Sequence, residues 1–189
     1  MHILMKKFGQ GDSHVLAGAL SGRKVHAELV ELTAREPGEP QPVFLDFDGV
    51  DVATASFLRE SILNFRDTVR SRRSNYYPVI ANASELVADE LNVLLAPRRD
   101  VLMLCSLDKN EKPSKARLLG DLDPKQHVTF ELVKKRGETT AAELHAHHGD
   151  GAVQNAWNNR LAALAGLGLI VELSQGRTKR YRPLLNGVA

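Results

Sequence analysis

The fold of the C-terminal part is decided by the stretch Ala152-Val153-Gln154-Asn155-Ala156-Trp157-Asn158-Asn159-Arg160-Leu161 and by Gly176-Arg177-Thr178-Lys179-Arg180-Tyr181-Arg182. We expect a helix from Ala152 to about Ala165. At about 100° per residue its apolar side holds Val153, Trp157, Leu161 and Leu164. Its polar side holds the amides Gln154, Asn155, Asn158 and Asn159. The second stretch is typical of a basic β-hairpin that turns at a glycine.

Two shorter helices are expected before this one. Pro124 begins a helix over 125–135 that ends at Gly137. Thr140 caps a helix over 141–147, with Glu143 at the third position of a capping box. Three helices followed by a hairpin resemble winged helix-turn-helix regulators over residues 124–185. That resemblance implies binding to double-stranded DNA, with one helix in the major groove and the hairpin along the backbone.

The residues expected to contact DNA follow from this arrangement. Asn and Gln can make bidentate contacts with adenine, which favours Gln154, Asn155, Asn158 and Asn159 as base readers. The hairpin residues Arg177, Thr178, Lys179 and Arg180 suit phosphates. Arg160 lies near the apolar side, so it is either a DNA contact or a residue that packs along the surface. Alternatively the amides are only a solvated face, and some winged helices bind protein instead of DNA.

The charge distribution sets the C-terminal part apart. Residues 1–124 hold 16 Lys+Arg and 18 Asp+Glu, whereas residues 125–189 hold 9 and 5. The net charge of +2 is therefore a combination of −2 and +4. A basic small domain indicates a polyanionic partner.

The N-terminal part alternates strands and helices. Strand-like runs are expected at 1–8, 42–48, 76–81, 101–107 and 115–119. Helices are expected at 13–33, 51–73 and 85–95, the last capped by Ser84. This order predicts an α/β sheet covered by helices. We expect two domains, an α/β domain over 1–122 and a second domain over 123–189.

One segment of this part resembles the STAS fold of anti-sigma-factor antagonists. Leu45-Asp46-Phe47 and Val50 match its strand and strand end, and Ser56 lies where its phosphorylatable serine begins a helix. The resemblance covers about residues 40–107. Thr54 stands where that family has an aspartate and Phe57 where it has a glycine, a variant closer to STAS-like regulators. It implies a bacterial-type regulator that senses a signal or binds a regulatory partner, such as a kinase or sensor ATPase, through Ser56 and Thr54.

The same segment also resembles a phosphatase motif. Asp46-Phe47-Asp48-Gly49-Val50 matches the first motif of haloacid-dehalogenase phosphatases, which implies a Mg²⁺ site with Asp46 as nucleophile and Asp48 as general acid/base. The spacing between Lys112 and Gly120 leaves no room for the rest of that fold. A turn rich in Asp and Gly after a strand is the simpler interpretation.

Other features limit the function. Cys105 is the only cysteine, and no apolar run reaches the length of a membrane span. The histidines His145, His147 and His148 lack a cysteine partner and are expected at the surface. We therefore expect a cytoplasmic, non-enzymatic DNA-binding transcriptional regulator with no catalytic residue, metal or cofactor, and no membrane partner. A homodimer would match palindromic operators.

Overall fold

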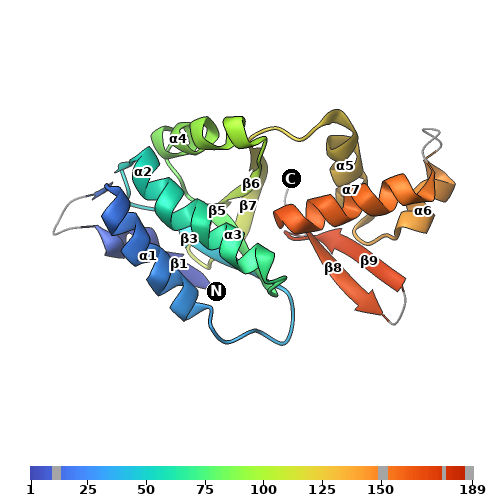
Figure 1. Cartoon of the computed structure of the whole chain (residues 1–189), viewed down its shortest axis with the longest axis horizontal. Helices are drawn as coiled ribbons and strands as arrows, with labels where there is room; N and C mark the ends of the chain where they lie inside the picture. The colour runs from blue at the N-terminus through green and yellow to red at the C-terminus, as the bar shows by residue number, and fades with distance from the viewer. Residues whose placement is uncertain (10–13, 149–152, 176–177, 186–189) are drawn as a thin grey trace. The chain divides into compact units, whose positions relative to one another are not determined.

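The chain forms two compact units. The computed structural model describes residues 1–9, 14–148, 153–175 and 178–185, with the backbone alone at 174 and 175. The first unit is Met1–Asp121 and the second begins at Leu122 (Figure 1). The division lies one residue before the boundary that the sequence predicts between residues 122 and 123. Within the described residues, no helix has the length and apolar character needed to cross a bilayer.

The first unit is built on a mixed, mostly parallel sheet, as the predicted α/β class requires. Its strand order is β1-β3-β5-β6-β7, in which β7 alone runs antiparallel. The strands are β1 (His2–Leu4), β3 (Gln41–Asp46), β5 (Tyr76–Ala81), β6 (Leu102–Leu107) and β7 (Pro113–Leu119). The apolar runs of these strands suit burial in the middle of the sheet, and β5, the central strand, is buried along its whole length.

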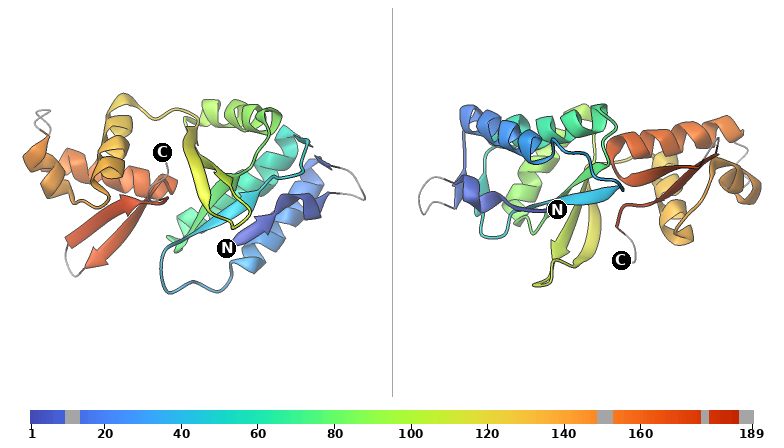
Figure 2. Two further views of the ribbon diagram at one scale, coloured as in Figure 1. Left: turned by 180° about the vertical axis from the view of Figure 1, so that it is seen from behind. Right: turned by 90° about the horizontal axis from the view of Figure 1, so that it is seen from below.

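Helices cover one face of this sheet. They are α1 (Ala19–Leu32), α2 (Ala55–Leu58), the π-helical turn η2 (Arg59–Leu63), α3 (Asn64–Ser71) and α4 (Glu85–Leu95), with short 3₁₀ turns η1 (Met5–Phe8) and η3 (Ala96–Arg98). Figure 2 shows α1 and α3 side by side on the sheet. Alternate strand residues such as Leu45, Ile80 and Leu104 join Leu29 and Phe57 of the helices in one hydrophobic core.

Two expected helices begin later than predicted. Val15–Leu16 (β2) and Val52–Ala53 (β4) pair as a small parallel ladder, in which Thr54 N–H donates to Leu16 O. The chain is therefore extended up to Thr54, and the helix expected from residue 51 starts at Ala55. At Gly18 a positive φ of 86° precedes α1, which starts at Ala19. Local periodicity cannot reveal this pairing because the two strands are far apart in sequence.

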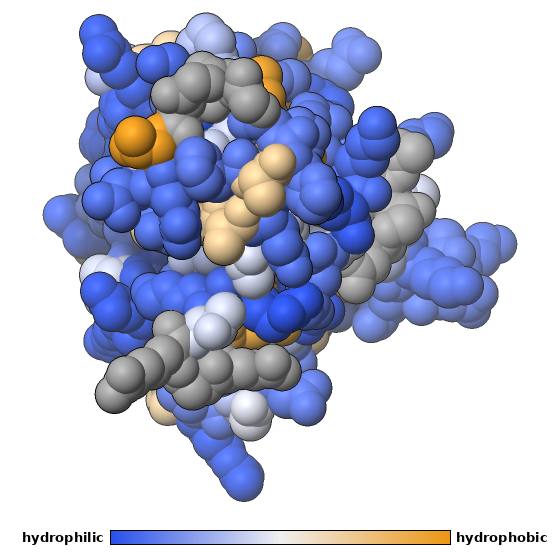
Figure 3. Space-filling view, turned by 90° about the vertical axis from the view of Figure 1, so that its right-hand side faces the viewer, coloured by the Kyte–Doolittle hydropathy of each residue, from blue (hydrophilic) through white to orange (hydrophobic). Residues whose placement is uncertain are grey.

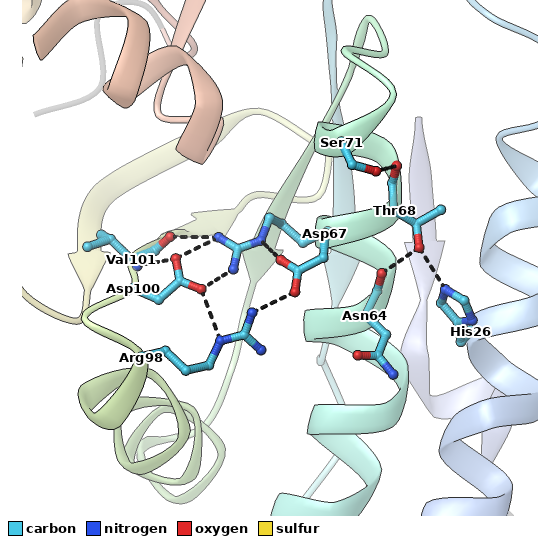
Figure 4. Close-up of polar contacts among 9 residues, drawn as sticks. His26, Asn64, Asp67, Thr68, Ser71, Arg98, Asp100 and Val101 are labelled. Carbon is cyan, nitrogen blue, oxygen red and sulfur yellow. Dashed lines mark hydrogen bonds and ion pairs between the residues drawn. The ribbon is translucent and has the colours of Figure 1, made fainter. Parts of the chain in front are cut away.

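A buried ion-pair network joins α3 to the start of β6 (Figure 4). The Arg66 guanidinium is 4% exposed and bonds Asp100, with Nη1 3.0 Å from Oδ1. It also donates to Val101 O and to Asp67. Arg98 in turn bridges Asp67 and Asp100. Each buried charge is thus matched, which is the condition for keeping an arginine in a core.

The second unit is three helices followed by a hairpin, in the predicted order. The elements are α5 (Pro124–Arg136), α6 (Ala141–His147), α7 (Gln154–Leu167), β8 (Ile170–Gln175) and β9 (Thr178–Pro183), with β8 and β9 antiparallel. The predicted capping box of Thr140 and Glu143 is confirmed. Thr139 and Tyr181 exchange two backbone hydrogen bonds, which tie the start of α6 to β9.

The core of this unit lies between the helices and the hairpin. Its buried side chains include Phe130, Val133, Leu144, Trp157, Leu161, Leu164 and Tyr181. The prediction that Val153 faces inward is wrong, because Val153 precedes α7 as its N-cap and is 67% exposed. The inward side of α7 therefore starts at Trp157.

Candidate functional site

The polar face of α7 is exposed. Gln154, Asn155, Asn158 and Asn159 are exposed, whereas Trp157 and Leu161, on the opposite side of the helix, are buried. All four amides lie in the first two turns of the helix. The end of α7 nearest the preceding loop thus presents side chains that can both donate and accept hydrogen bonds.

A groove of about 570 Å³ lies between α7, the start of α6 and strand β9. It is lined by Thr140, Ala141, Ala142, Gln154, Asn158, Asn159, Ala162, Thr178, Lys179 and Tyr181. Figure 3 views the molecule from the side on which α6 and the hairpin lie in Figure 1. The surface seen there is largely hydrophilic, with scattered apolar side chains. In the part of the chain that the structure describes, the lining contains one cation, Lys179, and no carboxylate.

The groove unites five of the eight residues that the sequence predicts for DNA contact. It brings three α7 amides opposite Thr178 and Lys179 of the hairpin. Asn155 is exposed on α7 but does not line the groove, and Arg180 does not line it either. Arg177 lies outside the described residues.

Acidic residues pair with two cations of the hairpin, Lys179 and Arg180. Lys179 Nζ lies 2.8 Å from Glu172 Oε1, and Arg180 bonds Glu138. The Glu138 carboxylate raises the pKa of Arg180 above its usual value. Tyr181 donates to Glu172, and burial, together with that carboxylate, raises the pKa of Tyr181 to about 12.

Sequence reasoning missed both of these acids. Glu172 faces Tyr181 in the hairpin register, and Lys179 lies two residues from Tyr181 on the same face. Period-2 alternation along β8 and β9 is the signal that could have identified Glu172. Glu138 has no such signal because it precedes α6 and is far from Arg180 in sequence.

The side chain of Arg160 packs on Trp157, outside the groove. Its guanidinium carbon lies 4.8 Å from the centre of the Trp157 ring, and Arg160 does not line the groove. This placement supports the surface-packing interpretation of Arg160, in which a cation stacks on an aromatic face. Trp157 itself is core, as predicted.

The second candidate site is the start of α2 in the first unit. Thr54 caps the helix by accepting from Phe57 N–H, and the Ser56 hydroxyl lies 3.2 Å from that of Thr54. Glu90 of α4 accepts a hydrogen bond of 3.0 Å from Ala55 N–H. Ser56 is half-buried. The carboxylate of Glu90, which the sequence alone did not indicate, thus accepts a hydrogen bond from the first N–H of α2, beside Ser56.

Asp46 lies at the carboxyl end of β3, and both oxygens of its carboxylate have hydrogen-bond partners. It is 4% exposed, and its Oδ1 accepts from Asp48 N–H and from Asn82 Nδ2, each at 2.9 Å. His2 Nε2 lies 2.7 Å from Oδ2, and His2 Nδ1 lies 2.7 Å from Glu111. Burial opposes protonation of His2, but the hydrogen bonds and charges of these two carboxylates outweigh it and raise its pKa. His2 thus links β1 to the end of β3 and to the turn between β6 and β7.

The Asp46 charge also acts on the only cysteine. Burial raises the pKa of the Cys105 thiol to about 12, and the nearby carboxylate adds to this effect. A thiol with such a pKa stays protonated and unreactive near neutral pH. Cys105 is therefore a packing residue.

The segment that holds the start of α2 also matches a known family model. Residues 21–74 match the model of the STAS-like domain of unknown function (DUF4325). The match runs from α1 to the residues just before β5 and includes Thr54, Ser56 and Asp46. The STAS-like resemblance, predicted over about residues 40–107, is confirmed over residues 40–74, and the match also extends to residues 21–39, which the prediction left out. No curated protein matches the chain.

Proposed function

We propose that the second unit is a winged helix that binds double-stranded DNA. In this proposal the STAS-like unit senses a signal or binds a regulatory partner, and the chain is a transcriptional regulator. The observation that carries the proposal is the groove in which the amides of α7 meet Thr178 and Lys179. An amide-rich helix and a basic hairpin are combined there on one surface, as DNA binding by helix and wing requires.

The dimensions of α7 suit this role. Its 14 residues span about 21 Å, and the major groove of B-DNA is about 12 Å wide and admits an α-helix. The amides lie at the N-terminal end of α7, the end of a recognition helix that contacts base edges. The positive charge excess of residues 125–189 supplies the attraction for phosphates.

The decisive test is DNA binding by fluorescence anisotropy at two salt concentrations. The full chain should bind a duplex, and Gln154→Ala/Asn158→Ala/Asn159→Ala should bind its preferred duplex at least about tenfold more weakly, since each good base contact contributes about 1–3 kcal/mol. Asn110→Ala removes an exposed amide from the first unit and should leave binding unchanged. Equal binding by the triple variant would contradict the α7 assignment. No binding by the parent chain would favour a protein-interaction adaptor.

The regulatory part of the proposal concerns Ser56. Its position at a helix start, in the segment that matches a STAS-like domain, supports a site for a partner or for phosphorylation. Glu90 would repel a phosphate on Ser56, so phosphorylation should alter the contact between α2 and α4. Peptide mass spectrometry of the chain isolated from its own cells would detect the modified serine. A chain that carries no phosphate under any growth condition would leave partner binding alone as the role of this surface.

The phosphatase alternative receives less support. The carboxylate of Asp46, its nucleophile, is buried with both oxygens in hydrogen bonds. An assay with an aryl phosphate and Mg²⁺ decides the matter. Hydrolysis that disappears in Asp46→Asn would replace the present proposal for the first unit.

A further inference from the structure

We propose that the duplex recognised by the second unit carries A·T base pairs where it faces the groove. This inference rests on the proposed function and deepens it, since it names the class of DNA sequence. It follows from the chemistry of the described side chains that line the groove, which offer partners for adenine and thymine and, apart from Lys179, no partner for guanine or cytosine.

The first step is the match between amides and adenine. Gln154, Asn158 and Asn159 each carry a carbonyl oxygen and an NH₂ group side by side. Adenine presents a donor and an acceptor in the major groove, so an amide satisfies both at once. Guanine presents two acceptors there. The carbonyl oxygen of the amide, itself an acceptor, would then face an acceptor of guanine and could form no hydrogen bond with it.

The second step is the lack of guanine and cytosine readers in the lining. Guanine is most often read by Arg or Lys, and cytosine by a carboxylate. Lys179, the one cation among the described residues of the lining, pairs with Glu172 and lies on the hairpin, where it suits a phosphate. The only cation of α7, Arg160, stacks on Trp157. No carboxylate lies among the lining residues within the described ranges.

The third step concerns thymine. Ala141, Ala142 and Ala162 line the groove beside the amides. A methyl side chain makes an apolar contact with the C5-methyl group of thymine and is small enough to let the base edge approach. The groove therefore offers a partner for each base of an A·T pair.

The test uses the full chain and duplexes of two helical turns, about 20 base pairs. Fluorescence anisotropy should give at least about tenfold tighter binding to an A·T-rich duplex than to a G·C-rich one. A duplex of inosine·cytosine pairs should bind like the G·C duplex, because its major groove resembles G·C whereas its minor groove resembles A·T. Replacing adenine with 7-deazaadenine or thymine with uracil should weaken binding, since each removes one of the contacts proposed.

Matched variants assign the preference to the groove. Asn158→Ala/Asn159→Ala should lose the preference for A·T while it keeps the affinity of the parent for the G·C duplex, and Asn110→Ala should change neither. Equal binding to A·T and G·C, or inosine·cytosine binding like A·T, would overturn this inference and leave the proposed DNA binding intact. Binding to no duplex would overturn both.

Discussion

The hairpin offers the most quantitative test of DNA binding, through Lys179. Each phosphate that a cation neutralises releases counterions, so the slope of log affinity against log salt concentration changes by about 0.9 per contact. Lys179→Gln removes the one positive charge that the described residues contribute to the groove. We therefore expect the slope to become shallower by about 0.9, with a similar loss of affinity for every duplex sequence.

The acidic partner of Lys179 predicts the opposite change. At 2.8 Å two unit charges attract by about 1.5 kcal/mol in water. Solvent and side-chain ordering leave about 0.2–1 kcal/mol for an exposed pair, and Lys179 is 56% exposed. DNA must compete with this pair, so Glu172→Gln should strengthen binding by up to about fivefold. Glutamine keeps an acceptor for the Tyr181 hydroxyl.

The assay is anisotropy titration of one duplex over a series of salt concentrations. Lys109→Gln is the matched control because it removes an exposed lysine from the first unit. An unchanged slope in Lys179→Gln, or an equal change in Lys109→Gln, would refute phosphate contact by this residue. Weaker binding by Glu172→Gln would show that the ion pair positions Lys179 instead of competing with DNA.

Three further predictions concern stability, each measured by urea denaturation. Arg66→Ala leaves the buried Asp100 carboxylate without its main partner and should cost about 3–5 kcal/mol; a loss under 1 kcal/mol would contradict the role of this pair. Because the pKa of His2 is raised, the contacts of His2 with Asp46 and Glu111 stabilise the fold fully at pH values below 6.5, the ordinary pKa of histidine. That stabilisation is lost as pH rises through the raised value, so the difference from His2→Gln should shrink at alkaline pH. Gly22→Ala should destabilise the fold by about 1–3 kcal/mol, because the added Cβ would lie 2.8 Å from a backbone oxygen of α2. Gly166→Ala, in open space on α7, should stabilise it by about 0.5–1 kcal/mol. Equal effects of the two substitutions would refute the close packing of α1 on α2.

Elements with strong local signals could be predicted from the sequence. The helix over 85–95 and its Ser84 cap occur as predicted, as does the helix over 141–147 with its capping box. These signals act between residues three or four apart, so they do not depend on the rest of the chain. The apolar side of α7 followed from periodicity for the same reason, except at Val153, which lies before the helix.

Elements that depend on distant partners could not be predicted. The helix expected from residue 51 starts at Ala55 because Val52–Ala53 pairs with Val15–Leu16. Nothing within either short segment indicates the other. The Arg66–Asp100 pair is a similar case, since its two residues belong to different elements.

The sequence by itself determined the STAS-like character of residues 21–74, the order of three helices and a hairpin, and the amide face of α7. These depend on motifs, caps and periodicity, which are properties of neighbouring residues. Only the tertiary structure decided which predicted residues share a groove. It brought Lys179 to the amides and placed Glu90 beside Ser56. Contacts of this kind are set by the packing of elements distant in sequence, and residue spacing along the chain does not record them.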